Sequence, residues 1–148
     1  MSGEVVIEAV ETVTGEHVAA VARLLPQLSS SPPPGRAELE AIVAQREATL
    51  LLARGGAEGE IVGMLTLLVY AIPTGRRAVI EDVVVDGAAR GTGVGARLVT
   101  EALRLAAARG ATSVDLTSRP SREAANRLYQ RLGFERRDTN VYRFDLAH

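Results

Sequence analysis

The stretch "ARGTGVGARLV", residues 89–99, contains the residues best suited to holding a ligand. Gly91, Gly93 and Gly95 follow Arg90 at every second position, after a run of valines and before a helical pattern. Glycine permits positive φ angles and lets the backbone approach a ligand closely. No acidic side chain follows in the first helical turn, so the free N–H groups there keep their positive polarisation. These features predict an anion-binding site at a helix N-terminus, with the Arg90 guanidinium beside it.

Two phosphate-binding motifs compete for this glycine stretch. A P-loop requires a lysine, and the chain contains none. A dinucleotide fingerprint is met by Gly91, Gly93 and Ala96, with Asp115 at about the expected 20 residues further on. Against it, five residues separate Val85 from the first glycine, and Asp115 falls inside a predicted strand. Too few residues also remain for a doubly wound sheet. A tight turn without any ligand is the structural alternative.

Two acids lie inside an apolar strand pattern, "VIEDVVV" at 79–85. Alternation along a regular strand would send Glu81 and Asp82 to opposite faces of the sheet. A carboxylate among apolar neighbours is a good proton acceptor near neutral pH. Glu81 is therefore the candidate base, or the group that orients a water molecule, and Asp82 is the second choice. In the structural alternative, one acid pairs with Arg76 or Arg77 and the other is solvated.

The composition excludes several other mechanisms. Without cysteine there is no thiolate nucleophile, disulfide or cysteine-ligated zinc, and without lysine there is no Schiff base. His17 and His148 are the only histidines, which leaves little room for a Ser-His-Asp triad, and we expect no metal site.

The charge distribution indicates where an anionic ligand would bind. Residues 1–75 hold 4 arginines and 9 acids, whereas residues 76–148 hold 13 arginines and 9 acids. An anionic ligand is therefore expected on the second half of the chain. The net charge of −1 predicts no partnership with nucleic acid or membranes. The acidic start "MSGEVVIEAVE" and the short apolar runs predict a cytoplasmic protein without a signal peptide.

The hydrophobic pattern predicts one α+β domain over residues 1–148, with a mixed central sheet. Short glycine-rich turns favour antiparallel pairing of the middle strands, and the strand-helix-strand order after residue 77 favours a parallel crossover. Ser121 is the expected N-cap of the last helix, and Gly133 lies past its end. Strands are expected at 4–10, 49–54, 60–70, 77–85, 112–118 and 140–146, and helices at 14–28, 36–48, 93–109 and 121–132.

Two of these motifs resemble those of the GNAT acetyltransferase superfamily. The stretch "VVVDGAARGTGVG", residues 83–95, follows the family's strand and [RQ]-G-x-G-x-[GA] pattern, with Val83 in place of leucine and Gly87 in place of proline. The stretch "AANRLYQRLGF", residues 124–134, matches A-x-x-L-Y-x-x-x-G-F. The order of elements agrees from residue 4 to 146. The resemblance implies a GNAT acyl-CoA N-acyltransferase fold, with a mostly antiparallel mixed sheet and acetyl-CoA as cosubstrate.

The resemblance also implies how acetyl-CoA binds. The pyrophosphate would lie on the N–H groups of residues 91–96, with Arg90 alongside. The pantetheine arm would pair like an added strand with the backbone near Val83 and Val85, and Asn126 would hydrogen-bond the arm. The implied cosubstrate-binding residues are Val83, Val84, Val85, Arg90, Gly91, Thr92, Gly93, Val94, Gly95, Ala96 and Asn126.

The chemistry that the resemblance implies is direct attack of an amine on acetyl-CoA in a ternary complex. Tyr129 is the candidate general acid for the leaving thiolate, and Glu81 is the candidate base. A backbone N–H within residues 83–85 would stabilise the oxyanion. In the structural alternative, Tyr129 is a core residue of an amphipathic helix.

The acceptor amine stays open. The resemblance implies that residues 24–40 and 136–140 shape the acceptor pocket. The stretch "IEDVVV" is locally similar to glucosamine-6-phosphate N-acetyltransferases, but a small amine, an amino acid, an antibiotic or a peptide N-terminus all remain candidates. A homodimer is common in the family. A non-catalytic acyl-CoA-binding or sensing module on the same fold is the alternative function, and it would need neither Tyr129 nor Glu81.

Overall fold

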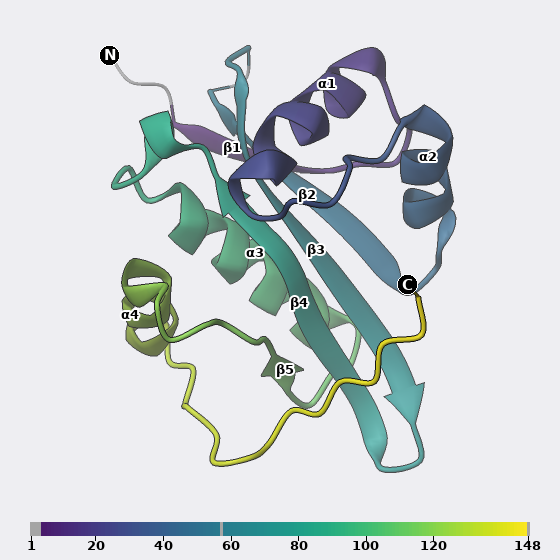
Figure 1. Ribbon diagram of the computed structural model, residues 1–148, viewed down its shortest axis with the longest axis vertical. Helices are drawn as coiled ribbons and strands as arrows, with labels where there is room; N and C mark the ends of the chain where they lie inside the picture. The colour runs from purple at the N-terminus through teal and green to yellow at the C-terminus, as the bar shows by residue number, and fades with distance from the viewer. Residues whose placement is uncertain (1–3, 57, 148) are drawn as a thin grey trace. The chain divides into compact units, whose positions relative to one another are not determined.

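The computed structural model describes residues 4–56 and 58–147 (Figure 1). The chain divides into two compact units, Met1–Thr117 and Ser118–His148, and each is described by itself.

The first unit is built on one sheet with the strand order β1-β2-β3-β4-β5. The pairs β1–β2, β2–β3 and β3–β4 are antiparallel, and β4–β5 is parallel. This confirms the predicted mixed, mostly antiparallel sheet and the parallel crossover. The strands are β1 (Val5–Ala9), β2 (Ala48–Gly55), β3 (Ile61–Ile72), β4 (Gly75–Val85) and β5 (Val114–Asp115).

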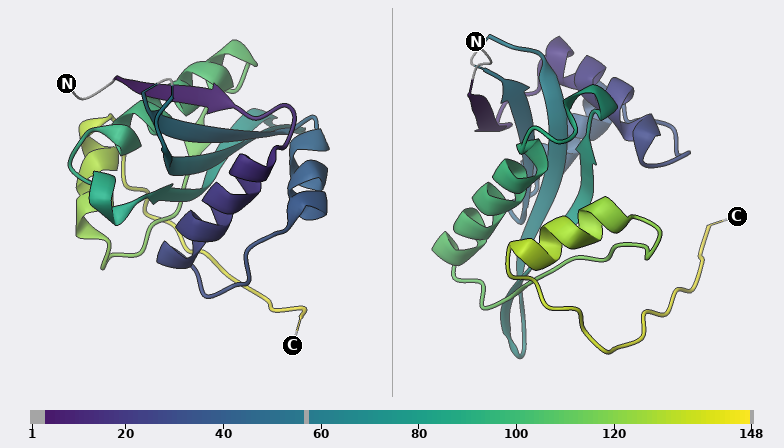
Figure 2. Two further views of the ribbon diagram at one scale, coloured as in Figure 1. Left: turned by 90° about the horizontal axis from the view of Figure 1, so that it is seen from above. Right: turned by 90° about the vertical axis from the view of Figure 1, so that its left-hand side faces the viewer.

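Helices cover both faces of this sheet (Figure 2). The helices α1 (Gly15–Leu24) and α2 (Arg36–Ala44) lie on one face, joined through the short 3-10 helix η1 (Leu25–Gln27), and α3 (Val94–Ala108) lies on the other face. A capping box fixes the start of α1. Thr14 Oγ1 accepts from the His17 N–H at 3.3 Å, and His17 Nδ1 accepts from the Thr14 N–H at 3.1 Å.

Each face has its own apolar core. Under α1 and α2 the buried side chains include Val21, Leu24, Leu39, Leu52 and Met64. The apolar stripe of α3 buries five side chains, as the helical spacing predicts: Val94, Leu98, Val99, Ala102 and Ala106.

Gly63 on β3 sets how closely α3 approaches the sheet. A Cβ atom at this position would lie 2.9 Å from Val94 Cγ1 and 3.0 Å from Leu98 Cδ1. Real Cβ contacts are longer, so a side chain here would push the first turn of α3 away from the sheet. The absence of a side chain at Gly63 therefore positions the N-terminus of α3.

Some predicted boundaries in the first unit are wrong. The helix predicted over 36–48 ends at Ala44, because the backbone of Gln45 turns to an extended conformation with ψ 128° and β2 begins at Ala48. Within the strand predicted over 112–118, Val114 and Asp115 form the ladder with β4, and Thr112 and Ser113 each add one backbone hydrogen bond to β4. Strand length is set by pairing across the sheet, which the local pattern does not encode.

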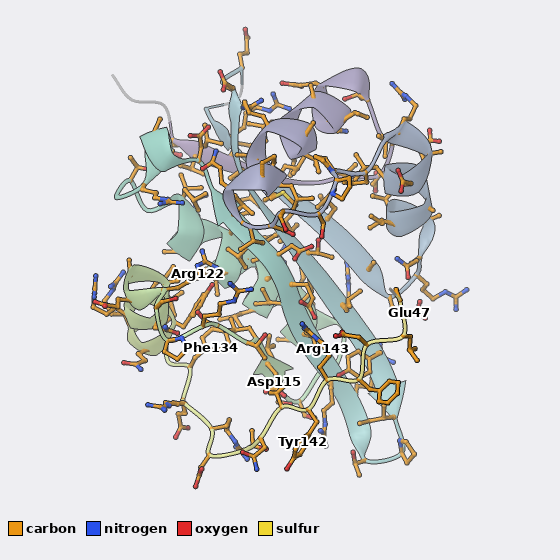
Figure 3. The ribbon with its side chains drawn as sticks, in the orientation of Figure 1. Glu47, Asp115, Arg122, Phe134, Tyr142 and Arg143 are labelled. Carbon is orange, nitrogen blue, oxygen red and sulfur yellow. The ribbon has the colours of Figure 1, made fainter. Side chains whose placement is uncertain are left out.

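The second unit contains the helix α4 (Glu123–Arg131). Gly133, with φ 104°, ends the helix as predicted, because its N–H donates to the Gln130 carbonyl and the Phe134 N–H donates to the Tyr129 carbonyl. Figure 3 labels Arg122 and Phe134 at the two ends of this helix.

The predicted N-cap of α4 is wrong. Arg122 takes that position instead of Ser121, and no side chain caps the helix. The Arg122 N–H donates to the Arg119 carbonyl at 3.0 Å, which forms a turn that moves the helix start one residue later.

The closing strand predicted over 140–146 does not form within the described part of the second unit. Its apolar side chains are exposed: Val141 by 76%, Tyr142 by 89%, Phe144 by 86% and Leu146 by 83% (Tyr142 is labelled in Figure 3). An alternating pattern makes a segment suitable for a strand, but a strand also needs a partner for its backbone. Within residues 118–147, the second unit contains α4 and no strand.

Candidate functional site

The glycine loop, residues 90–96, leads from β4 into α3. Gly91 and Gly93 have φ angles of 83° and 86°, and apart from the chain neighbours no heavy atom of the described residues lies within 4 Å of the Cβ position at either residue. The space in front of the loop is therefore open. The Thr92 hydroxyl donates to the Ala89 carbonyl, which ties the loop to the residue before Arg90.

The backbone N–H groups of the glycine loop are available to a ligand. From Gly91 to Ala96, none of these N–H groups donates to an acceptor within residues 4–56 and 58–147. The first N–H of this region that is satisfied belongs to Arg97, which donates to the Gly93 carbonyl at 3.1 Å. The first turn of α3 contains no acid. The end of a helix of 15 residues thus offers its dipole and free donors to an anion.

Side-chain hydrogen bonds hold the short segment between β4 and the glycine loop. Asp86 Oδ1 accepts from the Ala88 N–H at 3.0 Å and caps the 3-10 helix η2 (Gly87–Ala89). Gln27 Oε1, from η1, accepts from the Gly87 N–H at 3.0 Å. This contact ties the connection between α1 and α2 to η2, directly before the glycine loop. The sequence did not predict it, because the two partners lie 60 positions apart. The Arg90 side chain is exposed, and its Nε donates to the Val85 carbonyl at 3.4 Å.

The β4 strand has a free backbone edge before the glycine loop. β5 pairs with β4 only at Ala78 and Val79. Beyond Val79, no strand of the described first unit pairs with that edge of β4, which includes Val83–Val85. An extended ligand with amide groups can add to such an edge as a strand does. This edge is where the pantetheine arm is predicted to pair, and the course of the arm stays a prediction.

A β-bulge places the two carboxylates of β4 on the same face, which corrects the prediction of opposite faces. Glu81 pairs with Thr66 and Val84 pairs with Met64, so Asp82 and Val83 together face one residue of β3. Asp82 has φ 51°, a left-handed conformation that Asp tolerates better than most residues. The extra residue reverses the alternation, because each one-residue shift moves a side chain to the other face.

Both carboxylates consequently lie on the α1–α2 face. Glu81 stands opposite Thr66, and cross-strand partners point to the same side of the sheet. Asp82 lines a cavity together with Thr66. Both acidic side chains are exposed.

This cavity lies between the α1–α2 helices and the sheet, and we refer to it as the apolar cavity. Its volume is about 230 Å³. Helical and loop residues from the predicted 24–40 region contribute to it, which supports that part of the expected acceptor pocket. The lining residues are Val21, Leu25, Pro34, Leu39, Ile42, Leu50, Met64, Thr66 and Asp82.

The remaining predicted site residues lie on α4 in the second unit. Tyr129 is 6% exposed, and its ring packs edge-to-face on Phe134 with a centroid distance of 5.9 Å. Burial raises the pKa of the Tyr129 phenol above its usual value, although Arg122 opposes this effect. The phenol therefore keeps its proton at neutral pH. Asn126, three residues earlier, donates through Nδ2 to the Arg119 carbonyl at 2.9 Å.

The residues that the structure describes contain no group of three or more His, Asp or Glu side chains placed to hold a metal ion. Within the same residues, none of the helices has the length and apolar character needed to cross a membrane.

Comparison with known proteins identifies the family. The Acetyltransferase (GNAT) family profile matches residues 19–134, which include the glycine loop, both carboxylates of β4 and α4. The chain belongs to the GNAT acetyltransferase family. The sheet and its flanking helices are accordingly those of the GNAT fold, an α+β class, as the sequence predicted.

Two relatives and one solved structure illustrate the similarity. The chain is 33% identical over 126 residues to glucosamine 6-phosphate N-acetyltransferase 1 of Oryza sativa subsp. japonica, covering 80% of this chain and 74% of that protein. It is 33% identical over 129 residues to glucosamine 6-phosphate N-acetyltransferase of Trypanosoma brucei brucei, covering 83% and 85%. The crystal structure of a Trypanosoma brucei acetyltransferase superposes with a TM-score of 0.78 at 27% identity, covering 97% of this chain and all of that one.

Proposed function

We propose that this GNAT protein is an N-acetyltransferase that transfers the acetyl group of acetyl-CoA to a primary amine. The observation that carries the proposal is the row of N–H groups from Gly91 to Ala96 that donate to no acceptor within the described residues. They lie at the N-terminus of α3, next to the edge of β4 that no described strand of the first unit covers. A pyrophosphate satisfies these donors, and an amide-rich arm satisfies the strand edge. Coenzyme A contains both groups.

Arg90 assists from the side of the loop. Its exposed guanidinium makes one long hydrogen bond, 3.4 Å to the Val85 carbonyl, among the residues that the structure describes, so it can turn to a phosphate oxygen. Asn126 binds the arm through its amide oxygen or its second Nδ2 proton, because one Nδ2 proton is already donated to the Arg119 carbonyl.

The transfer proceeds by direct attack in a ternary complex. The amine nitrogen bonds to the thioester carbonyl carbon, and the C–S bond then breaks as the tetrahedral intermediate collapses. A backbone N–H of Val83–Val85 stabilises the oxyanion. Glu81 accepts the amine proton, directly or through one water molecule, and Tyr129 donates its proton to the leaving thiolate. The products are an amide and the free thiol of coenzyme A.

Two properties support these roles. Tyr129 is buried and its pKa is raised, so the phenol is protonated and available as an acid at neutral pH. Glu81 is exposed on the same face as the apolar cavity, where an acceptor amine can reach it. A non-catalytic acyl-CoA-binding module is the second candidate, because binding at the glycine loop requires neither Tyr129 nor Glu81.

The deciding experiment follows the release of free thiol from acetyl-CoA with a panel of primary amines, alongside the acetyl-CoA-induced shift in Tm. An acetyltransferase shows both the shift and amine-dependent thiol release. A shift without thiol release for any amine would establish the binding module. An equal shift with NAD and no preference for acetyl-CoA would contradict both.

A further inference from the structure

The chemistry of the apolar cavity indicates which amine the site accepts. Seven of its nine lining residues are apolar, one is a threonine, one is an aspartate and none is cationic. The apolar part is deep: Leu39 and Leu50 are each 2% exposed, and Met64 is 4% exposed. Asp82 is exposed, so the carboxylate marks the end of the cavity that opens to solvent. The cavity therefore has a hydrocarbon interior and an anionic mouth.

The arginines of α1 and α2 do not add a cation to this cavity. Arg23 donates to the Ile61 carbonyl and pairs with Glu60 Oε1 at 3.4 Å. Arg36 donates to the Val13 carbonyl at 2.9 Å. A sugar phosphate would bring a dianion and several hydroxyl groups into this space. Burying such groups without partners is costly, and Asp82 would repel the phosphate.

We propose, as a refinement that rests on the proposed function, that the acceptor is a small primary amine with a hydrocarbon body. The body fills the apolar cavity, and the ammonium group meets the Asp82 carboxylate at its mouth. The volume of about 230 Å³ lies below the 300–1,000 Å³ typical of sites for drug-sized ligands, which selects a small acceptor. The acceptor differs in chemistry from glucosamine 6-phosphate, for which the two relatives are named.

The bulge in β4 explains how binding leads to reaction. Asp82 holds the ammonium form, and Glu81 lies next to it on the same face. The ammonium group first releases one proton to water, and the lone pair of the neutral amine then bonds to the thioester carbonyl carbon. The second nitrogen proton passes to Glu81, directly or through water. The C–S bond breaks, the thiolate takes a proton from Tyr129, and an N-alkyl acetamide leaves.

A homologous series of amines tests this inference directly. With acetyl-CoA saturating, kcat/KM is measured by thiol release for ethylamine through hexylamine and for glucosamine 6-phosphate. Each methylene that enters an apolar cavity should raise kcat/KM by about fourfold, until the cavity is full. Glucosamine 6-phosphate should be a poorer substrate than hexylamine by at least about 100-fold.

Two variants locate the acceptor. Asp82→Asn retains a residue that tolerates the left-handed conformation but removes the charge, and it should lower kcat/KM for every alkylamine by about tenfold or more, chiefly through KM. Ile42→Ala enlarges the cavity and should move the optimum to a longer amine. Glu40→Gln, on the exposed side of α2, is the matched control and should leave the series unchanged.

The outcomes separate this inference from the proposed function. If glucosamine 6-phosphate is acetylated faster than hexylamine, or if the series is flat, the hydrocarbon acceptor is wrong while acetyl transfer stands. If acetyl-CoA binds but no alkylamine reacts, the hydrocarbon acceptor is again wrong. If acetyl-CoA neither binds nor is consumed, both proposals fail. Tm values for Ile42→Ala and Asp82→Asn verify that each variant is folded.

Discussion

The glycine loop and the apolar cavity belong to the same unit, but they are built in opposite ways. The loop is one continuous segment of seven residues, 90–96, whose function comes from backbone N–H groups and positive φ angles. The cavity is assembled from side chains spread between Val21 and Asp82, contributed by α1, α2, the connection between them and three strands. One region offers donors to an anion, and the other offers hydrocarbon and a carboxylate.

This difference explains how proteins of one fold can bind the same cosubstrate and yet differ in the acceptor that they use. Backbone N–H groups do not depend on which side chains surround them, so the loop needs only glycines and a helix behind it. The cavity depends on each lining side chain, so single substitutions alter its size and polarity. We therefore expect substitutions in the loop to act on acetyl-CoA alone, and substitutions in the cavity to act on the amine alone.

The largest effect is expected for Gly93→Asp in the loop. The new carboxylate would stand at the positive end of α3, where the pyrophosphate belongs, and measurable acetyl-CoA binding should be lost. Apart from the chain neighbours, no heavy atom of the described residues lies within 4 Å of the Cβ position. The φ angle of 86° strains any side chain, but aspartate is among the residues that tolerate it best, so we expect the fold to be retained at some cost in Tm. Calorimetric titration with acetyl-CoA and the ligand-induced Tm shift measure this result.

Gly93→Asn is the matched control, since asparagine has nearly the same size and also tolerates φ 86°. It should retain most of the affinity that the aspartate removes. An equal loss of acetyl-CoA affinity in both variants would mean that steric hindrance causes the effect, and it would contradict an anion-binding site at this loop.

The second-largest effect is expected for Tyr129→Phe. This change alters the catalytic step but leaves the glycine loop and the apolar cavity intact. The ring and its contact with Phe134 remain, but the phenol proton is removed. The kcat value should fall by about 10²–10⁴-fold while the Kd of acetyl-CoA and the KM of the amine hold. In the wild-type protein, the raised pKa predicts that acid function persists through neutral pH and is lost only in strongly alkaline solution. An unchanged kcat would make Tyr129 a core residue.

The local features of the site were predictable from the sequence. Gly91, Gly93 and the acid-free first turn of α3 are read from neighbouring residues, and the structure has the positive φ angles and the open helix end that they require. The antiparallel strands, the crossover and the helix end at Gly133 follow from equally local signals.

The features that depend on tertiary pairing were not predictable. The bulge at Asp82 depends on how β4 aligns with β3, and a regular alternation therefore gave Glu81 and Asp82 the wrong relative faces. The lining of the cavity depends on the packing of α1 and α2. The segment 140–146 has the pattern of a strand, yet whether it pairs depends on a partner that its own residues do not specify.

A smaller effect is expected for Glu81→Gln. Glutamine keeps the size and hydrogen bonding of the side chain but accepts no proton, so kcat/KM at neutral pH should fall by up to about 100-fold, because water can replace part of the function. The loss should shrink at alkaline pH, where more of the amine is already neutral. Asp82→Asn is not a valid control, since the bulge brings Asp82 to the same face. Glu40→Gln serves as the control instead, because Glu40 is exposed on α2. If the pH dependence of kcat/KM in Glu81→Gln is identical to that of the wild type, the amine loses its proton to solvent.

The smallest effect on turnover is expected for Gly63→Ala, which tests whether the loop and the cavity are mechanically independent. Gly63 is adjacent to Met64, which lines the cavity, and it contacts Val94 and Leu98 of α3 on the opposite face. The added methyl group would meet both α3 side chains at about 3 Å and the Val84 carbonyl at 3.3 Å, so α3 must shift. Such overpacking lowers the free energy of unfolding by about 1–3 kcal/mol.

If the two regions are independent, the Kd of acetyl-CoA rises several-fold while the chain-length dependence of the amine series is unchanged. Ala53→Gly on β2 is a control that loosens the sheet without adding volume next to α3. A change of chain-length preference in Gly63→Ala, absent from the control, would mean that α3 and the cavity wall move together and that the two regions form one site.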